Sequence, residues 1–198
     1  MEHFENPGGV LAETGRILRA PAFLYVAVPD ASTLTDRLYR WLGRGGGHVN
    51  QFSDGHALVK LIEHQTGLPL AGARLLFSSL AFLNRRNNLG KRPRRIYLVG
   101  GGWEWTLRVG TFLLRNCDRL LGTRSSVYGW ACYFGAAVEA ETHPWSNVCI
   151  RCGSGHSSER LRASGRVRRG KLGIRLFRCP DCGAENYFTD DADYQEFR

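Results

Sequence analysis

Four cysteines near the C-terminal end constrain the fold of this chain more than any other feature. They form two CxxC pairs, each followed by a glycine, and a 26-residue stretch separates the pairs. Within a pair, two intervening residues bring both sulfurs to one side of a tight turn, and the glycine lets the backbone pass without a Cβ clash. Two such knuckles are typical of a zinc ribbon. We therefore predict that one tetrahedral Zn²⁺ is held by Cys149, Cys152, Cys179 and Cys182.

A site of four thiolates leaves the metal no open position, so we expect this zinc to be structural and not to activate water. The alternatives are two disulfides or four unrelated buried cysteines. No export signal opens the chain and no apolar run reaches membrane-spanning length. A reducing cytoplasm, where thiols stay free for metal, is therefore the expected location.

The balance of charge points to a polyanionic partner. The chain carries a formal charge of +9 with a pI near 9.6, while 43% hydrophobic residues among 198 are enough for one modest core plus a small module. Nucleic acid is favoured over an acidic membrane as the partner. The alternative is that the charge serves only solubility.

Clustering of the cations favours nucleic acid. Residues 84–95 hold six cations and no acid, and residues 151–178 hold nine Arg or Lys against the single acid Glu159. The second cluster would form the tip of the ribbon. We predict that these cations contact phosphates. The candidate residues are Arg74, Arg85, Arg86, Lys91, Arg92, Arg94, Arg95, Arg166, Arg168, Arg169 and Lys171.

The middle of the chain reads as helical. Ser53 or Asp54 would cap a helix that ends at Gly67, and a second helix would begin at Pro69 and run to Leu83. This pair is either a helix-turn-helix, whose second helix would enter the major groove, or an ordinary αα-hairpin. Further helices are expected from Trp103 and over residues 125–141, with their aromatic residues in the core.

The predicted fold class is therefore mainly α, with a small β ribbon at the end. Residues 1–20 are expected to be loosely ordered, residues 22–28 to form a short strand or extended segment, and Ser32 or Thr33 to cap a helix. Cys117 and Cys132 lack knuckle spacing and are expected to be buried thiols. The expected domains are an N-terminal extension (1–50), a helical domain (51–145) and a zinc ribbon with an acidic tail (146–198).

From Leu58 to the ribbon, the order of features resembles FlhC, the zinc-containing subunit of the bacterial flagellar master regulator. The likeness lies in residues 61–75, which read LIEHQTGLPLAGARL, in the tryptophan-rich middle and in the helix leading to Cys149. It implies a DNA-binding transcriptional activator that works in a hetero-oligomer with a smaller FlhD-like helical partner. The chain departs from that pattern in some fifty extra N-terminal residues, a longer loop between the knuckles and an acidic tail.

The ribbon alone is similar to the one that ends OrfB-type transposases. There, Phe-x-Cys-x-x-Cys-Gly precedes an Asp-Ala-Asp stretch, as in Phe177–Gly183 and Asp191–Asp193 of this chain. In that family the final Asp, here Asp193, serves a metal-dependent nuclease. The rest of this chain is too short and too poor in acids for such a nuclease core.

These features predict a DNA-binding transcriptional regulator with a structural zinc ribbon and no catalytic site. The alternative is a non-catalytic nucleic-acid-binding subunit of a ribonucleoprotein, such as an RNA-guided, CRISPR-type or mobile-element complex. Charge clusters cannot separate DNA from RNA, because phosphate contacts carry no base information. A nuclease that uses Asp190, Asp191 and Asp193 to hold Mg²⁺ is a third possibility, although a solvated acidic tail explains these residues as well.

Overall fold

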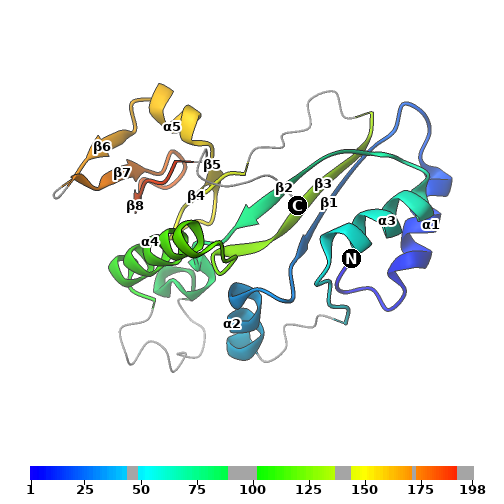
Figure 1. The fold of residues 1–198 in the computed structure, drawn as a ribbon, viewed down its shortest axis with the longest axis horizontal. Coiled ribbons are helices and arrows are strands. Elements are labelled where there is room, and N and C mark those ends of the chain that lie inside the picture. Colours follow the sequence, from blue (N-terminus) through cyan, green and yellow to red (C-terminus); the bar gives the residue numbers. More distant parts are fainter. Residues whose placement is uncertain (44–48, 89–101, 137–143, 171–172, 191–198) are drawn as a thin grey trace. The chain divides into compact units, whose positions relative to one another are not determined.

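The fold is seen in a computed structural model that describes residues 1–43, 49–88, 102–136, 144–170 and 173–190 (Figure 1). Within these ranges the chain has five α-helices, two short 3-10 helices and eight strands in three sheets. The protein is therefore mixed α/β, and the prediction of a mainly α fold is wrong.

Helices and strands are interspersed along the chain. The helices are α1 (Pro7–Ile17), α2 (Leu34–Gly43), α3 (Gly55–Thr66), η1 (Ala81–Leu83), η2 (Arg85–Asn88), α4 (Glu104–Leu121) and α5 (Ser158–Ala163). The strands are β1 (Phe23–Pro29), β2 (Leu70–Phe77), β3 (Val127–Gly135), β4 (Asn147–Val148), β5 (Gly155–His156), β6 (Val167–Arg169), β7 (Arg175–Arg178) and β8 (Glu185–Tyr187).

The chain divides into two compact units, each assembled from stretches far apart in sequence. The first, called the sheet unit below, comprises Met1–Leu76, Tyr128–His143 and Glu196–Arg198. The second, called the ribbon unit, comprises Phe77–Val127 and Pro144–Gln195. The predicted domain limits at residues 50 and 145 stay a prediction.

The sheet unit is built on a three-stranded sheet in which β3 is the middle strand, between β1 and β2. β1 and β3 are antiparallel, with Val26 opposite Cys132. The predicted strand at residues 22–28 is confirmed as β1, but the predicted helix over residues 125–141 is wrong. Val127–Gly135 begins with a β-branched valine and has four aromatic residues among its nine, and both kinds suit a buried strand. As expected, Trp130, Cys132 and Phe134 are buried in it.

The predicted helix-turn-helix does not form, because its second helix is the strand β2. The first helix, α3, follows the prediction: Asp54 accepts from the backbone N–H of His56 and Ala57, and Gly67 ends it in the left-handed conformation. After Gly67 the chain stays extended, and Glu63 accepts a hydrogen bond from the N–H of Leu70 at 2.8 Å. Pairing within the sheet outweighs the helix propensity of this Leu- and Ala-rich stretch.

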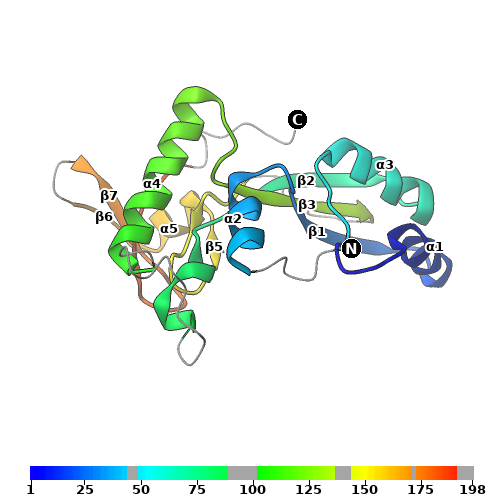
Figure 2. The ribbon, with the colours of Figure 1, turned by 90° about the horizontal axis from the view of Figure 1, so that it is seen from below.

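The N-terminal residues are also more ordered than expected. Asn6 caps α1 by accepting from the N–H of Gly9 at 2.9 Å, Pro7 occupies the first turn, and Leu11 is buried. The prediction of a loose segment over residues 1–20 is therefore wrong. α1 packs against α3, and the two helices lie side by side in both ribbon views (Figure 2). Thr33 caps α2 as predicted, accepting from the N–H of Asp36.

The ribbon unit contains α4, α5 and the small sheets β4-β5 and β6-β7-β8. The helix predicted from Trp103 is confirmed as α4, but its buried face is largely polar. On that face, Thr111 donates to the carbonyl of Ser79 and Arg115 to that of Ser78, each at 3.1 Å. Asp118 accepts from the N–H groups of Ser125 and Ser126, both at 2.6 Å.

Several apolar residues of α4 face outward instead. Trp103 and Trp105, expected in the core, are 51% and 59% exposed, and Leu113 is 56% exposed. Cys117 is exposed as well, so the prediction of a buried thiol holds for Cys132 and is wrong for Cys117. The buried face of α4 is therefore the more polar one.

Candidate metal centre and cationic surface

The two cysteine knuckles repeat one backbone motif. In the first, the N–H of Cys149 bonds to Ser154 O at 2.9 Å and the N–H of Gly153 to Cys149 O at 3.0 Å. In the second, the N–H of Cys179 bonds to Ala184 O at 2.9 Å and that of Gly183 to Cys179 O at 3.0 Å. Both glycines have positive φ, 79° and 72°, as the sequence predicted. Each turn therefore holds its two cysteines in the same way.

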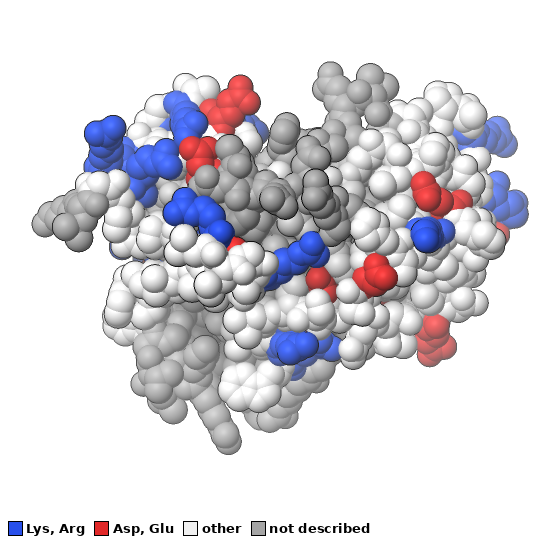
Figure 3. All heavy atoms as spheres, viewed as in Figure 1, with Lys and Arg blue, Asp and Glu red and all other residues white. Residues whose placement is uncertain are grey.

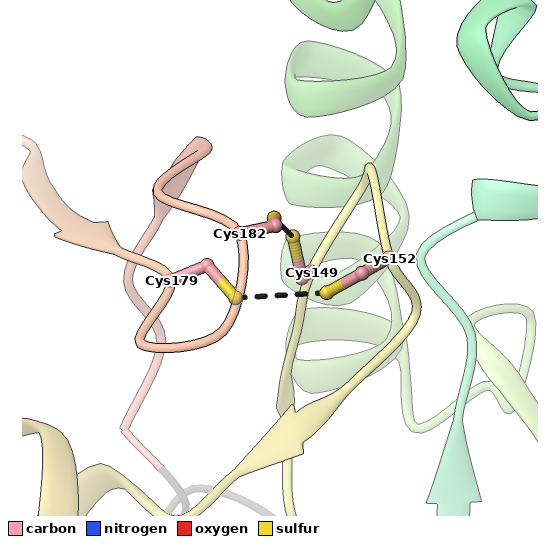
Figure 4. Close-up of side chains that lie close together, drawn as sticks. All are labelled: Cys149, Cys152, Cys179 and Cys182. Carbon is pink, nitrogen blue, oxygen red and sulfur yellow. Dashed lines mark hydrogen bonds between the residues drawn. The ribbon is translucent and has the colours of Figure 1, made fainter.

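The knuckles bring all four sulfurs together (Figure 4). The Sγ atoms of Cys149 and Cys182 are 3.5 Å apart, those of Cys152 and Cys179 are 3.6 Å apart, and all four lie within 4.8 Å of one another. Zinc–sulfur bonds of about 2.3 Å in a tetrahedron separate the sulfurs by about 3.8 Å. All four cysteines are free. Their spacing is compatible with a metal ion, and the disulfide alternative finds no support in it.

The protonation of these thiols depends on their burial. Burial raises the pKa of Cys149 to about 11 and raises the pKa of Cys179 further. At Cys152, hydrogen bonds that include those of Ser154 outweigh the effect of burial, and the pKa falls to about 7. A bound divalent cation would supply the positive charge that holds all four as thiolates.

Buried polar side chains fix the first knuckle to its surroundings. Asn186 accepts from the N–H of Ile150 at 2.8 Å, Ser79 donates to Cys149 O at 2.7 Å, and Asn84 donates to Ile150 O at 3.0 Å. These contacts come from segments well before and after the knuckle in sequence. They complete the backbone hydrogen bonds of a turn whose own geometry is set by the cysteines.

His156, which the sequence placed beside the first knuckle, lies close to the four cysteines. Its Nε2 is 3.5 Å from Cys179 Sγ and 3.8 Å from a carboxylate oxygen of Asp181. Burial lowers its pKa, so the neutral ring is favoured. Since four cysteines already provide a complete tetrahedral set, His156 is a neighbour of this set and not a needed member.

The predicted cationic tip of the ribbon is partly matched by acids. Arg166, Arg168 and Arg169 are exposed on and beside β6, but Arg168 forms an ion pair with Glu185. Asp190 pairs with Arg162 and with Arg175. Figure 3 shows this mixture of blue and red side chains over the region of β6 and β7. Lys171 lies outside the described residues.

A shallow hollow of about 530 Å³ brings three of the ribbon cations together. It is lined by Gly165, Arg166, Arg168, Arg178, Gly183 and Glu185. Arg169 faces elsewhere, because neighbouring residues of a strand point to opposite faces. Arg178 was not among the predicted contacts. Its signal was available in the sequence, because it directly precedes Cys179 and must lie beside the second knuckle.

The first cationic cluster is described only in part. Arg85 and Arg86 lie on η2 and are exposed, whereas Arg74 lies in β2 and is only 7% exposed. Arg74 therefore does not belong to the exposed cationic surface. The remaining members of this cluster, Lys91, Arg92, Arg94 and Arg95, lie outside the described residues, as do Asp191, Asp193 and Glu196 of the tail.

Comparison with known proteins identifies no relative of this chain, so its function is inferred from the structure. No family model, no curated protein and no solved structure matches this chain. None of the helices in the described ranges is long and apolar enough to cross a membrane.

Proposed function

We propose that this protein binds nucleic acid and that the ribbon unit supplies its phosphate-contacting surface. The observation that carries the proposal is the hollow in which Arg166, Arg168 and Arg178 converge around one carboxylate, Glu185. Three guanidinium groups against one acid leave a local excess of two positive charges. Guanidinium groups donate paired N–H bonds that match phosphate oxygens, so the hollow suits a sugar–phosphate backbone.

The metal centre would keep this surface in shape. Arg178 directly precedes Cys179 and Gly183 directly follows Cys182, so both border the second knuckle. The Nε of Arg178 also donates to Gly183 O at 3.3 Å. A surface fixed before binding loses less conformational entropy when it meets its ligand. Four thiolates at tetrahedral spacing suit zinc, and we propose Zn²⁺ as the metal, with a structural role.

A DNA-binding regulator that acts with a protein partner remains the proposed biological role, but without the predicted base-reading helix. Residues 70–77 form a strand, so the second helix of the expected pair is not available to a major groove. What supports the proposal is therefore a cationic surface that suits phosphates, and phosphate contacts do not distinguish sequences. A ribonucleoprotein subunit is the competing role.

The test is the affinity of the zinc-loaded full chain for duplex DNA, single-stranded DNA and structured RNA at several salt concentrations. We expect Arg166→Ala and Arg178→Ala each to weaken binding of all sequences alike and to lower the salt slope for duplex DNA by about 0.9. Glu185→Gln should act in the opposite direction and tighten binding, because Glu185 is the one acid among the described residues that line the hollow.

Two matched controls separate this surface from general charge. Arg169→Ala removes a cation beside the hollow, and Arg19→Ala removes an exposed cation of the sheet unit. Both should lower affinity less than Arg178→Ala does. Equal losses in all four variants would show that only net charge matters. A clear preference for structured RNA would contradict the role of a DNA-binding regulator and support that of a ribonucleoprotein subunit.

A further inference from the structure

A second surface of the ribbon unit combines exposed indole rings with cations. It is a shallow hollow of about 370 Å³, lined by Asn84, Arg85, Arg86, Gly102, Trp103, Glu104 and Trp105. We call Arg85, Arg86, Trp103 and Trp105 the tryptophan ledge. Trp103 is 51% and Trp105 59% exposed, which is unusual for side chains of this size. Both rings therefore offer apolar surface to a ligand.

The charge of the ledge is positive. The guanidinium carbon of Arg85 lies 5.8 Å from the centroid of the Trp103 ring. Glu104, the acid of the hollow, is paired with Arg86 at 3.4 Å and with Arg151 at 2.6 Å. In the described part of the chain, Arg85 has no carboxylate within ion-pair distance. Arg85, beside the exposed Trp103 ring, is thus available to bind a negatively charged group of a ligand.

The ledge is attached to the first cysteine knuckle. The N–H of Arg85 donates to Gly102 O at 3.0 Å, which joins η2 to the start of α4. Asn84 and Asn87 donate to the carbonyls of Ile150 and Arg151, at 3.0 and 2.6 Å. These bonds fix the backbone from which the rings and cations project, and a surface fixed before binding loses less entropy on binding.

We propose that the tryptophan ledge binds a single-stranded nucleic acid by stacking its unpaired bases on Trp103 and Trp105, with Arg85 contacting the adjacent phosphate. Aromatic rings beside cations are the common means of binding single strands, because every base has a face that can stack. Bases in a duplex are stacked on one another and cannot reach such rings. The inference rests on the proposed function in that the ligand is nucleic acid, but it adds a preference for unpaired strands.

The experiment uses the zinc-loaded full chain and three probes: homopolymers of deoxythymidine and of uridine about 12 nucleotides long, and a duplex of equal length. We expect both single strands to quench tryptophan fluorescence and to bind more tightly than the duplex. Trp103→Ala and Trp105→Ala should each weaken single-strand binding by about tenfold or more. Their affinity for the duplex should change by less than about twofold.

Trp41→Ala is the matched control, because Trp41 is 76% exposed on α2 in the sheet unit. It should leave single-strand affinity unchanged, and Trp103→Phe should restore part of what Trp103→Ala loses. Native single-strand affinity in both alanine variants would overturn the inference and leave the ledge to another ligand, such as a protein segment. Equal losses for single strands and duplex would also overturn it. If the native chain binds none of the probes, the proposed function itself fails.

Discussion

The sheet unit and the ribbon unit are stabilised by different kinds of interaction. In the sheet unit, β1 and β3 pair over seven residues each, from Phe23 opposite Gly135 to Pro29 opposite Gly129. Apolar side chains such as Ile62 and Phe134 are fully buried there. In the ribbon unit, the apolar cluster around the knuckles has six buried members, and two of them are the cysteines Cys149 and Cys179.

The difference shows what the metal would do for a module of this size. A small module cannot bury enough apolar surface to offset the entropy of ordering its loops. In the ribbon unit, four cysteine sulfurs lie within 4.8 Å of one another and several side chains donate to backbone carbonyls, and a metal bound by these sulfurs would compensate for the small apolar core. Its stability should therefore depend on metal and on polar contacts, and that of the sheet unit on packing. Three substitutions test this contrast.

The largest effect is expected for Cys179→Ser. Structural zinc sites contribute about 10–16 kcal/mol of binding free energy to folding, so losing a ligand should unfold the metal-bound module. Metal analysis should find about one zinc per native chain and much less in the variant. Hydrogen exchange should show protection lost around residues 149–186 and kept in β1 and β3.

Cys117→Ser is the control for this experiment. Cys117 is exposed on α4 and lies outside the group of four sulfurs, so the substitution should leave zinc content and hydrogen exchange unchanged. A metal-free chain whose knuckles stay fully protected would contradict the assignment of the site.

A smaller effect, confined to the other unit, is expected for Phe134→Ala. Phe134 is 0% exposed in the middle strand of the sheet unit, and its truncation should cost about 3–5 kcal/mol. Denaturant unfolding followed by circular dichroism measures the loss, and Phe23→Ala, at a side chain 51% exposed, should cost far less. If Phe134→Ala released the zinc as readily as it unfolded the sheet, the two units would not be energetically separate.

The smallest of the three effects is expected for Asn186→Ala. This side chain is 2% exposed and accepts from the N–H of Ile150, so its loss leaves a buried donor without a partner at a cost of about 1–3 kcal/mol. Zinc should leave the variant faster in a competition with a chelator. Asn116→Ala, which removes only a bond within α4, should not change that rate. Equal rates of zinc loss for the native chain and Asn186→Ala would show that this polar contact does not stabilise the metal centre.

Local sequence patterns were enough to predict the turns and helix ends, whose contacts lie within a few residues of one another. The cysteine spacing predicted which four sulfurs come together, because each CxxC turn closes within a few residues and presents its two sulfurs on one side. Both ends of α3 were predicted for the same reason: Asp54 was one of two candidate caps and Gly67 was the expected end. Thr33 was one of two residues predicted to cap α2 and is the one that does so.

The tertiary structure decided the features that depend on distant partners. Residues 70–77 have a helical composition but form a strand in the sheet whose middle strand begins fifty residues after this strand ends. The same holds for the surfaces. Arg178 meets Arg166 only through the pairing of β6 with β7, and Trp103 is exposed because the polar face of α4 is the one that finds hydrogen-bond partners. The four cysteines could be read from spacing alone, but the arginines and indole rings grouped around them could not, because packing and not composition determines which side of an element is covered.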